Sequence, residues 1–311
     1  MEGKIHRRYS NLTTKGSFSG ADGFIKSAKL PISSKRVRDE LLKIKSYALH
    51  QPARKNFPRR RVLVNGINQQ WGMDLADIQK LSRYNKGKKY ILCIIDMFSK
   101  MAWLEAIPNK SAPVVAKAIQ KVFHTVGATP KRMQCDKGSE FYNSHVKNLM
   151  KKYKINMFSV ESDKKCCVVE RFIRTLFSKI RRYMTHKQTK KFARNLPWFE
   201  WLYNNSYHRS IQMRPVEVNK DNEHIVFYNL YAKSFPPIFK KPKFRIGDKC
   251  LVVKTKSMFE KGTTQSYIDE TFYIKQVRHT IPTTYVLRDI DGTQIKGSFY
   301  EEQLKPVNYV Q

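Results

Sequence analysis

Three acidic residues lie in settings that could bring them together as a site for phosphoryl transfer. Asp74 lies in the alternating run WGMDLAD, Asp136 ends RMQCD before the turn-like KGSEF, and Glu170 lies in VVERFIRTL, which has helical spacing. Two Mg²⁺ ions about 3.5–4 Å apart activate the attacking oxygen and stabilise the leaving oxygen of a phosphodiester, and such ions prefer carboxylate ligands. We therefore expect all three residues to be catalytic metal ligands, although their spacing does not decide which carboxylate bridges two ions.

Other acidic residues compete for the same role. Asp77 and Asp96 lie near the ends of apolar runs, and Glu140 follows four residues after Asp136. Asp96 is the best rival, but its place before FSK is more consistent with capping a turn. Glu140 is expected in a loop beside the site. The alternatives remain open at the level of sequence.

Basic residues close to the three acids are candidate DNA contacts. Arg174 and Arg181 follow Glu170 by four and eleven residues, so both lie near its face of a helix. A solvated Glu170–Arg174 ion pair is an equally good interpretation of that spacing. We expect further contacts from neighbouring basic residues and from one histidine, which is more consistent with a structural or DNA-binding role than with a catalytic base: Lys137, Arg171 and His208.

The chain carries a large positive charge. It has 60 Lys and Arg against 25 Asp and Glu among 311 residues, a net charge of +35, and 41% of its residues are hydrophobic. A folded body this basic repels itself unless a polyanion neutralises it, so we expect double-stranded DNA as the partner. A ribosomal-type or chromatin-packing protein is the simpler alternative, but acidic residues within apolar runs disfavour it.

Cysteine usage and the absence of long apolar segments indicate where the protein resides. Five cysteines, an odd number without a CxxC pair, favour a reducing compartment and disfavour a zinc site of paired cysteines. Neither a signal-peptide pattern after Met1 nor a run approaching membrane-spanning length is present, so we expect an intracellular protein without a membrane segment. The basic run KNFPRRR at 55–61 could serve in nuclear import, so we expect the nucleus.

The central part of the chain predicts a mixed sheet flanked by helices. Apolar alternation and apolar runs predict five strands, and helical periodicity with capping signals predicts three helices. In Asp74's strand, alternation places the carboxylate on the face opposite Met73. The strands are expected near 71–76, 90–96, 103–107, 132–135 and 155–160, and the helices near 111–127, 144–154 and 166–185. The order β-β-β-α-β-α-β-α predicts an α/β domain with the acids at strand ends and on the last helix.

The flanking segments predict two small additional modules. Residues 1–62 hold one helix candidate at 34–50, followed by an extended basic linker. Residues 63–230 form the core, 231–242 are a Pro- and Lys-rich linker, and 243–308 hold short strands with a hairpin signal at Asp291-Gly292. We expect a small N-terminal helical module and a C-terminal SH3-like or chromo-like β-barrel.

Several motifs in order resemble a known family. WGMDLAD, QCDKGSEFYN and KKCCVVERFIRTL resemble the acidic motifs of the retroviral-type integrase core, which has an RNase H-like fold. The later segment WLYNNSYHRSIQMRPVEV resembles retrotransposon integrases. With YALHQPARKNFPRRRV upstream and FRIGDKCLVV downstream, residues 45–307 are most similar to integrases of Maverick/Polinton self-synthesising DNA transposons.

The resemblance implies a DDE recombinase that uses two Mg²⁺ or Mn²⁺ ions. Such an enzyme has endonuclease and polynucleotidyl transferase activity: it trims the 3′ ends of element DNA and transfers them into target DNA, working as a homo-multimer. The matching catalytic residues are Asp74, Asp136 and Glu170. The sequence departs from the retroviral pattern in a shorter spacing between Asp136 and Glu170, in Lys137 where Asn is common, and in lacking an N-terminal His-His-Cys-Cys zinc module. Residues 34–50 could replace that module.

Two other functions are compatible with the sequence. One is a catalytically inactive, host-adopted DNA-binding protein that retains the integrase fold. Its intact acidic trio disfavours it, because a disused site has no physical reason to keep three carboxylates that are costly to desolvate. The other is an RNase H-like nuclease acting on hybrids, which the expected C-terminal barrel and basic flanks make a poorer fit.

Overall fold

The computed structural model describes residues 2–29, 32–54, 56–159, 167–232, 241–254 and 264–307. The chain divides into two compact units, one made of residues 62–235 and the other of residues 1–61 together with 236–311. We call them the core unit and the discontinuous unit, and each is described by itself. Among the described helices, none is both long and apolar enough to cross a membrane.

The core unit is built on one mixed sheet of five strands in the order β3-β2-β1-β4-β5. The first three strands are antiparallel, and the last two run parallel to β1. The strands are β1 (Gln70–Asp77), β2 (Tyr90–Asp96), β3 (Ala102–Ile107), β4 (Arg132–Gln134) and β5 (Asn156–Phe158). The mixed five-strand sheet flanked by helices that the sequence predicted is confirmed.

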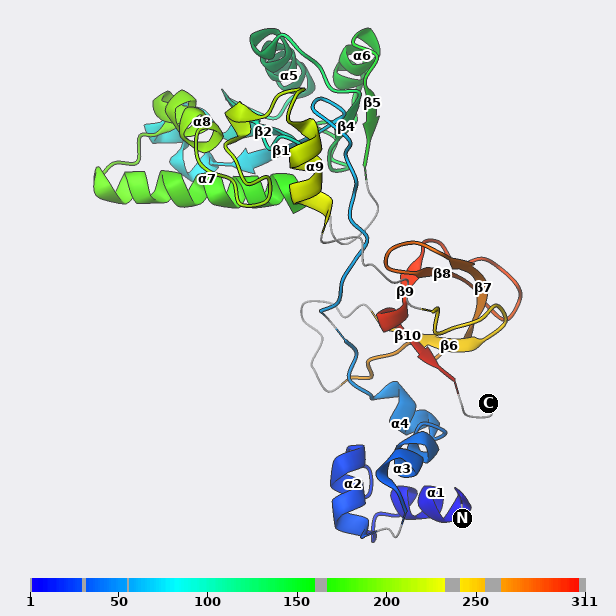
Figure 1. The fold of residues 1–311 in the computed structure, drawn as a ribbon. Coiled ribbons are helices and arrows are strands. Elements are labelled where there is room, and N and C mark those ends of the chain that lie inside the picture. The colour runs from blue at the N-terminus through cyan, green and yellow to red at the C-terminus, as the bar shows by residue number, and fades with distance from the viewer. Residues whose placement is uncertain are drawn as a thin grey trace. The chain divides into compact units, whose positions relative to one another are not determined.

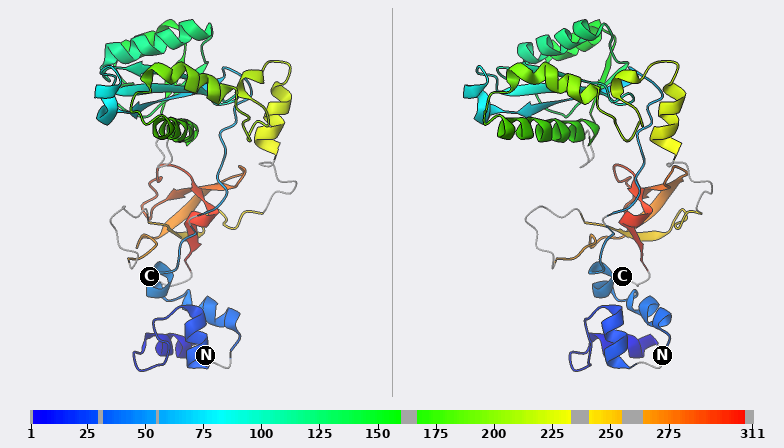
Figure 2. Two further views of the ribbon diagram at one scale, coloured as in Figure 1. Left: turned by 90° about the vertical axis from the view of Figure 1, so that its left-hand side faces the viewer. Right: turned by 60° about the vertical axis from the view of Figure 1, so that its left-hand side comes forward.

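Helices cover both faces of this sheet (Figures 1 and 2). One face packs on α5 (Ala112–Val126) and α6 (Ser144–Lys152), and the other on α7 (Cys167–His186). Side chains of α8 (Leu196–Asn204) and α9 (Glu223–Tyr231) join the core on the α7 side. Alternation along β1 explains the two cores, because Met73 faces the α5 side while Ala76 faces α7. Short 3₁₀ turns complete the unit: η1 (Gln79–Tyr84), η2 (Ala193–Asn195) and η3 (Pro215–Glu217).

Helix α8 closes the exposed edge of the sheet. Strand β3 is an edge strand, and the side chain of Asn204 accepts from Ala102 N at 2.9 Å and donates to Ala102 O at 2.8 Å. Glu200, one turn earlier, accepts from Leu104 N at 2.7 Å. These side chains take the place of a further strand, so the edge is not free to pair with another chain.

The first residues of the core unit are held by its last helix. Val64 N donates to the Tyr231 hydroxyl at 3.0 Å, and Ile67 N donates to Glu223 Oε1 at 2.8 Å. Gly66 allows this approach, because a Cβ there would lie 2.8 Å from Glu223 Oε1. The chain therefore begins and ends this unit at neighbouring points.

Four helices form the N-terminal part of the discontinuous unit: α1 (Glu2–Ser10), α2 (Ala21–Ala28), α3 (Ser34–Leu41) and α4 (Lys45–Leu49). The prediction of a single helix over 34–50 was wrong. Ile44 has extended φ and ψ of −92° and 115°, which separates α3 from α4. The break lets Val37, Leu41 and Ile44 pack with α1 and α2, while Leu49 packs against a different part of the unit.

The C-terminal part is an antiparallel sheet in the order β10-β6-β7-β8-β9. Its strands are β6 (Lys249–Val252), β7 (Phe272–Arg278), β8 (Thr284–Arg288), β9 (Phe299–Tyr300) and β10 (Leu304–Pro306), with the 3₁₀ turn η5 (Glu301–Gln303) before the last. Gly292 turns the chain after β8 with φ of 87°. This sheet is compatible with the small barrel that we expected.

The two parts of the discontinuous unit contact each other directly. Leu49 packs with Leu251 and Tyr267, and its carbonyl accepts from Ser266 N at 2.9 Å. Further along, Arg60 N donates to the Tyr300 hydroxyl at 3.1 Å. The chain is therefore bound to the C-terminal part at the end of α4 and again at Arg60, which no sequence pattern indicated.

Candidate active site

Strand β1 positions Asp74 on the sheet face that α7 covers. Asp74 is paired with Cys93 of β2, and Cys93 belongs to the core beneath α7. The carboxylate is half-buried, and its Oδ1 accepts from Leu75 N at 2.7 Å. Sequence alternation correctly placed Asp74 opposite Met73.

Strand β4 brings Asp136 alongside. The parallel register joins Gly72 to Gln134, so two further residues along both chains bring Asp136 level with Asp74. Cys135 N still donates to Phe158 O of β5 at 3.2 Å, which holds the chain in line up to this point. Asp136 is half-buried just beyond the strand.

Glu170 lies in the first turn of α7 and is exposed. Its neighbours Val169 and Phe172 are buried beneath the helix, which fixes the helix against β1 and β2. The amino end of a helix carries a partial positive charge that stabilises a carboxylate there.

The negative charges of neighbouring acids act on Asp74. Its pKa is raised to about 6, first by burial and then by the negative charges of Asp136, Glu170 and Glu140, while the Leu75 N–H opposes the rise. Asp136, Asp74 and Glu140 also contribute, after burial, to raising the pKa of the Cys135 thiol to about 12. A site that collects like charges in this way favours a bound cation.

The type of donor suits a hard divalent cation. Carboxylate oxygens are the ligands that Mg²⁺ prefers. Within the described ranges, no three His, Cys, Asp or Glu side chains are already gathered closely enough to hold an ion. Asp74, Asp136 and Glu170 therefore supply fitting ligands from neighbouring elements, and their side chains would have to draw together around a metal.

The structure separates the rival acids. Asp96 is fully buried and accepts from Phe98 N at 3.1 Å and from Ser99 Oγ at 2.8 Å, so it caps the β2–β3 turn as its position suggested. Asp77 is exposed and accepts from Gln79 N at 2.8 Å. Glu140 is different, because its charge reaches Asp74 and its carboxylate folds over Gly138. Sequence analysis placed Glu140 beside the site but could not show that it faces Asp74.

The candidate DNA contacts occupy different surroundings. Lys137, Arg171, Arg174 and Arg181 are exposed, and their roles stay predictions. His208 is half-buried, with its Nδ1 3.0 Å from Ser210 Oγ and its backbone N–H donating to Met213 O at 2.9 Å.

The charge state of His208 follows from its surroundings. Its pKa is lowered to about 4, mainly by burial and then by the positive charges of Lys100 and Arg171. His208 therefore stays neutral at neutral pH and ties together a turn.

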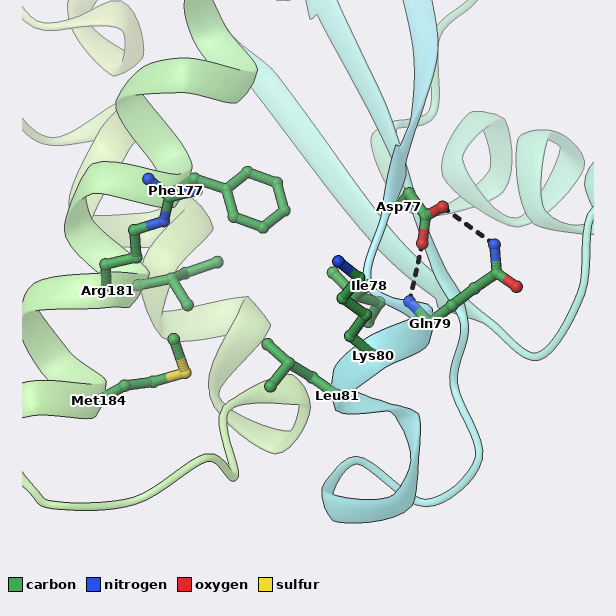
Figure 3. A pocket seen from close by; sticks show the side chains of 9 residues that line it. Asp77, Ile78, Gln79, Lys80, Leu81, Phe177, Arg181 and Met184 are labelled. Carbon is green, nitrogen blue, oxygen red and sulfur yellow. Dashed lines mark hydrogen bonds between the residues drawn. The ribbon is translucent and has the colours of Figure 1, made fainter.

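A groove that sequence analysis missed lies farther along α7. It has a volume of about 670 Å³ and lies between η1 and the C-terminal half of α7 (Figure 3). Phe177, Arg181 and Met184 border it on α7, and Lys80 and Leu81 border it on η1. Only the packing of η1 on α7 creates it, and this packing has no local sequence signal.

The mixed five-strand sheet with helices on both faces matches an RNase H-like integrase core. Residues 65–159 match the family model described as "Integrase core domain". The chain is also 34% identical over 208 residues to a transposon-derived protein of Caenorhabditis elegans, a match that covers 66% of this chain and 69% of that protein. The protein therefore belongs to this family of transposon-derived integrase-core proteins.

A solved structure shares the fold. It is a chain from the cryo-electron microscopy structure of the simian T-cell lymphotropic virus intasome in complex with PP2A regulatory subunit B56 gamma. The TM-score is 0.65 with 12% sequence identity, and the alignment covers 99% of each chain. At 12% sequence identity this similarity is evidence for a shared fold alone.

Proposed function

We propose that this protein is the integrase of a mobile element of the Maverick/Polinton type. It would trim the 3′ ends of the element DNA and transfer them into target DNA as a polynucleotidyl transferase. The proposal is supported by the placement of three acids on neighbouring elements of an integrase-core fold. Asp74 lies on the sheet face that α7 covers, the parallel register brings Asp136 level with it, and Glu170 lies in the first turn of α7.

Each group then has a specific task. Asp74, Asp136 and Glu170 would hold two Mg²⁺ or Mn²⁺ ions, which when bound supply an activated oxygen nucleophile and stabilise the leaving oxygen. Lys137, Arg171, Arg174 and Arg181 bind backbone phosphates around the site, and His208 supports this surface as a structural residue. Because two element ends must be joined together, the protein acts as a homo-multimer on double-stranded DNA, in the nucleus.

The test is a joining assay with purified protein, a labelled duplex carrying the element terminus, and a plasmid target. Wild-type protein should join the two with Mg²⁺ or Mn²⁺ and not in the presence of a chelator. Glu170→Gln should reduce joining by at least about 100-fold while keeping DNA affinity, because an amide is a poor ligand for these ions. Joining by Glu170→Gln at the wild-type rate would contradict the assignment.

Two further variants serve as controls. Asp221→Asn makes a similar change at an exposed acid of the core unit and should leave joining unchanged. Glu140→Gln tests whether Glu140 is a fourth metal ligand. Joining at the wild-type rate by this variant would exclude Glu140 from the metal ligands.

The second candidate is a host-adopted DNA-binding protein without activity. It is favoured by the fact that the described acids are not already gathered for an ion. Tight DNA binding by the wild-type protein, without joining in either metal, would support this candidate over the integrase.

A further inference from the structure

The groove beside α7, here called the α7 groove, has an apolar floor and a polar rim. Ile78 and Ile180 form fully buried parts of the floor, and half-buried Phe177 and Met184 stand above them. Figure 3 shows the Phe177 ring pointing from α7 into the space beside η1. An apolar cavity with an aromatic wall that opens to solvent is suited to a flat, partly polar ligand.

The cations of the rim outweigh its acid. Arg181 and Lys80 are exposed at the two sides of the groove. The carboxylate of Asp77 is turned to Gln79, which donates to it from its backbone N–H at 2.8 Å and from Nε2 at 2.9 Å (Figure 3). The rim therefore favours an anionic group next to the flat ligand.

The α7 groove lies on the same side of α7 as the candidate active site. Glu170, Arg174, Phe177 and Arg181 are spaced by four, three and four residues, so they form one stripe along the helix. At 1.5 Å per residue, Arg181 lies about 16 Å along the axis from Glu170. That is about five nucleotides at the rise of a duplex strand and fewer in an extended strand.

We propose that the α7 groove binds an unpaired nucleotide of the DNA substrate, a few nucleotides from the reacting phosphate. The base stacks on Phe177 above the apolar floor, and the adjoining phosphate pairs with Arg181. A paired base could not enter, because its faces are covered by its neighbours in the duplex. The inference rests on the proposed function for its choice of ligand, and it assigns a binding site to a part of the molecule away from the acids.

Binding measured without metal tests the proposal. Two probes are compared by fluorescence anisotropy in a chelator: a blunt duplex, and the same duplex with a short unpaired thymidine tail on one strand. Wild-type protein should prefer the tailed duplex. Phe177→Leu, which keeps apolar bulk but removes the ring, should lower that preference about tenfold, as expected for one lost base–aromatic stack.

Matched variants separate stacking and local charge from general effects. Phe177→Tyr keeps a ring and should restore the preference. Arg181→Gln should weaken binding of the tailed duplex more than Arg182→Gln does, because Arg182 is equally exposed but absent from the lining of the groove. Unchanged preference in Phe177→Leu, or equal losses in the two arginine variants, would overturn the proposal.

The preference for the tailed duplex is measured separately from the DNA-joining reaction. A tail preference that follows Phe177 in a protein that joins no DNA would leave the α7 groove standing and remove the proposed reaction. Efficient joining by a protein whose preference for the tailed duplex does not depend on Phe177 would support the proposed reaction and remove the nucleotide site in the α7 groove.

Discussion

At the scale of single residues, burial and neighbouring charge act on Asp74 and His208 in the same physical way. Both pKa values move so that the neutral form is favoured, to about 6 for Asp74 and to about 4 for His208. In both residues, neighbouring like charges shift the pKa in the same direction as burial does. These charges belong to acids around Asp74 and to Lys100 and Arg171 around His208. The two groups therefore have opposite effects on stability as the pH falls.

His208 should make the core unit less stable in acid. Between about pH 6.5 and about pH 4 the unfolded chain holds a proton on this residue while the folded chain does not, so acidification favours unfolding. His208→Gln removes that contribution, so its deficit in unfolding free energy relative to wild type should shrink as the pH is lowered through this window.

Urea unfolding followed by tryptophan fluorescence provides the measurement. All four tryptophans, Trp71, Trp103, Trp198 and Trp201, lie in the core unit, so the signal reports that unit alone. Asp74 acts in the opposite direction below about pH 6, because its folded form takes up the proton first. The contribution of Asp74 is the same in wild type and in the His208 variant, so it cancels when the two are compared at the same pH. A deficit of His208→Gln that does not change with pH would exclude the proposed role of His208.

How far the sequence predicts the candidate site depends on the kind of contact. The positions of Asp74 within a strand and of Asp136 just after one could be predicted because alternation and strand ends are local properties of the chain. The turn-capping role of Asp96 followed from the same local reasoning. The approach of Glu140 to Asp74 and the packing of Phe177 near Leu81 join segments far apart in sequence, and single-sequence periodicity contains no record of such pairs.

At the scale of elements, α8 shows how a helix can complete a sheet. Asn204→Ala should destabilise the core unit by about 2–4 kcal/mol, because it leaves both Ala102 N and Ala102 O without their side-chain partner in a buried place. The neighbouring Asn205→Ala is the control, since this residue is half-buried and donates within α8 to Trp201 O at 2.9 Å. Urea unfolding followed by tryptophan fluorescence should show a much smaller loss for Asn205→Ala, and equal losses would contradict the edge-closing role.

Helix limits were predictable where the chain supplies its own stop signals. Helix α5 begins after Ser111 with Pro113 in its first turn and ends at Gly127, whose φ is 68°. The α3–α4 region has no such signal. Its break at Ile44 lets Tyr47 of α4 stay in the cluster of the N-terminal helices while Ala48 and Leu49 reach Leu251 and Tyr267. Tertiary packing overrides local helical preference at this position.

At the scale of the whole molecule, residues 1–61 and the C-terminal sheet should fold cooperatively. Leu49 is 6% exposed and contacts Leu251 and Tyr267. Leu49→Ala should therefore destabilise the unit by about 2 kcal/mol or more and increase hydrogen exchange in both α4 and β6. Hydrogen–deuterium exchange with mass spectrometry measures both segments at once.

Leu42→Ala provides the comparison, because Leu42 packs only against the cluster formed by α1 to α4. It should increase exchange in the N-terminal helices and leave β6 unchanged. Exchange in β6 that is insensitive to Leu49→Ala would mean that the two parts fold separately.

The hydrogen bonds from Val64 to Tyr231 and from Ile67 to Glu223 have a topological consequence. They bring the two ends of the core unit together. This unit is inserted in sequence into the discontinuous unit, whose two parts contact each other although more than half of the chain separates them. An inserted unit whose two ends lie close together can be replaced by another unit without changing the rest of the chain. Replacing the core unit by a related core, or by a short flexible linker, should leave the discontinuous unit able to fold. The core unit and the discontinuous unit can therefore diverge independently.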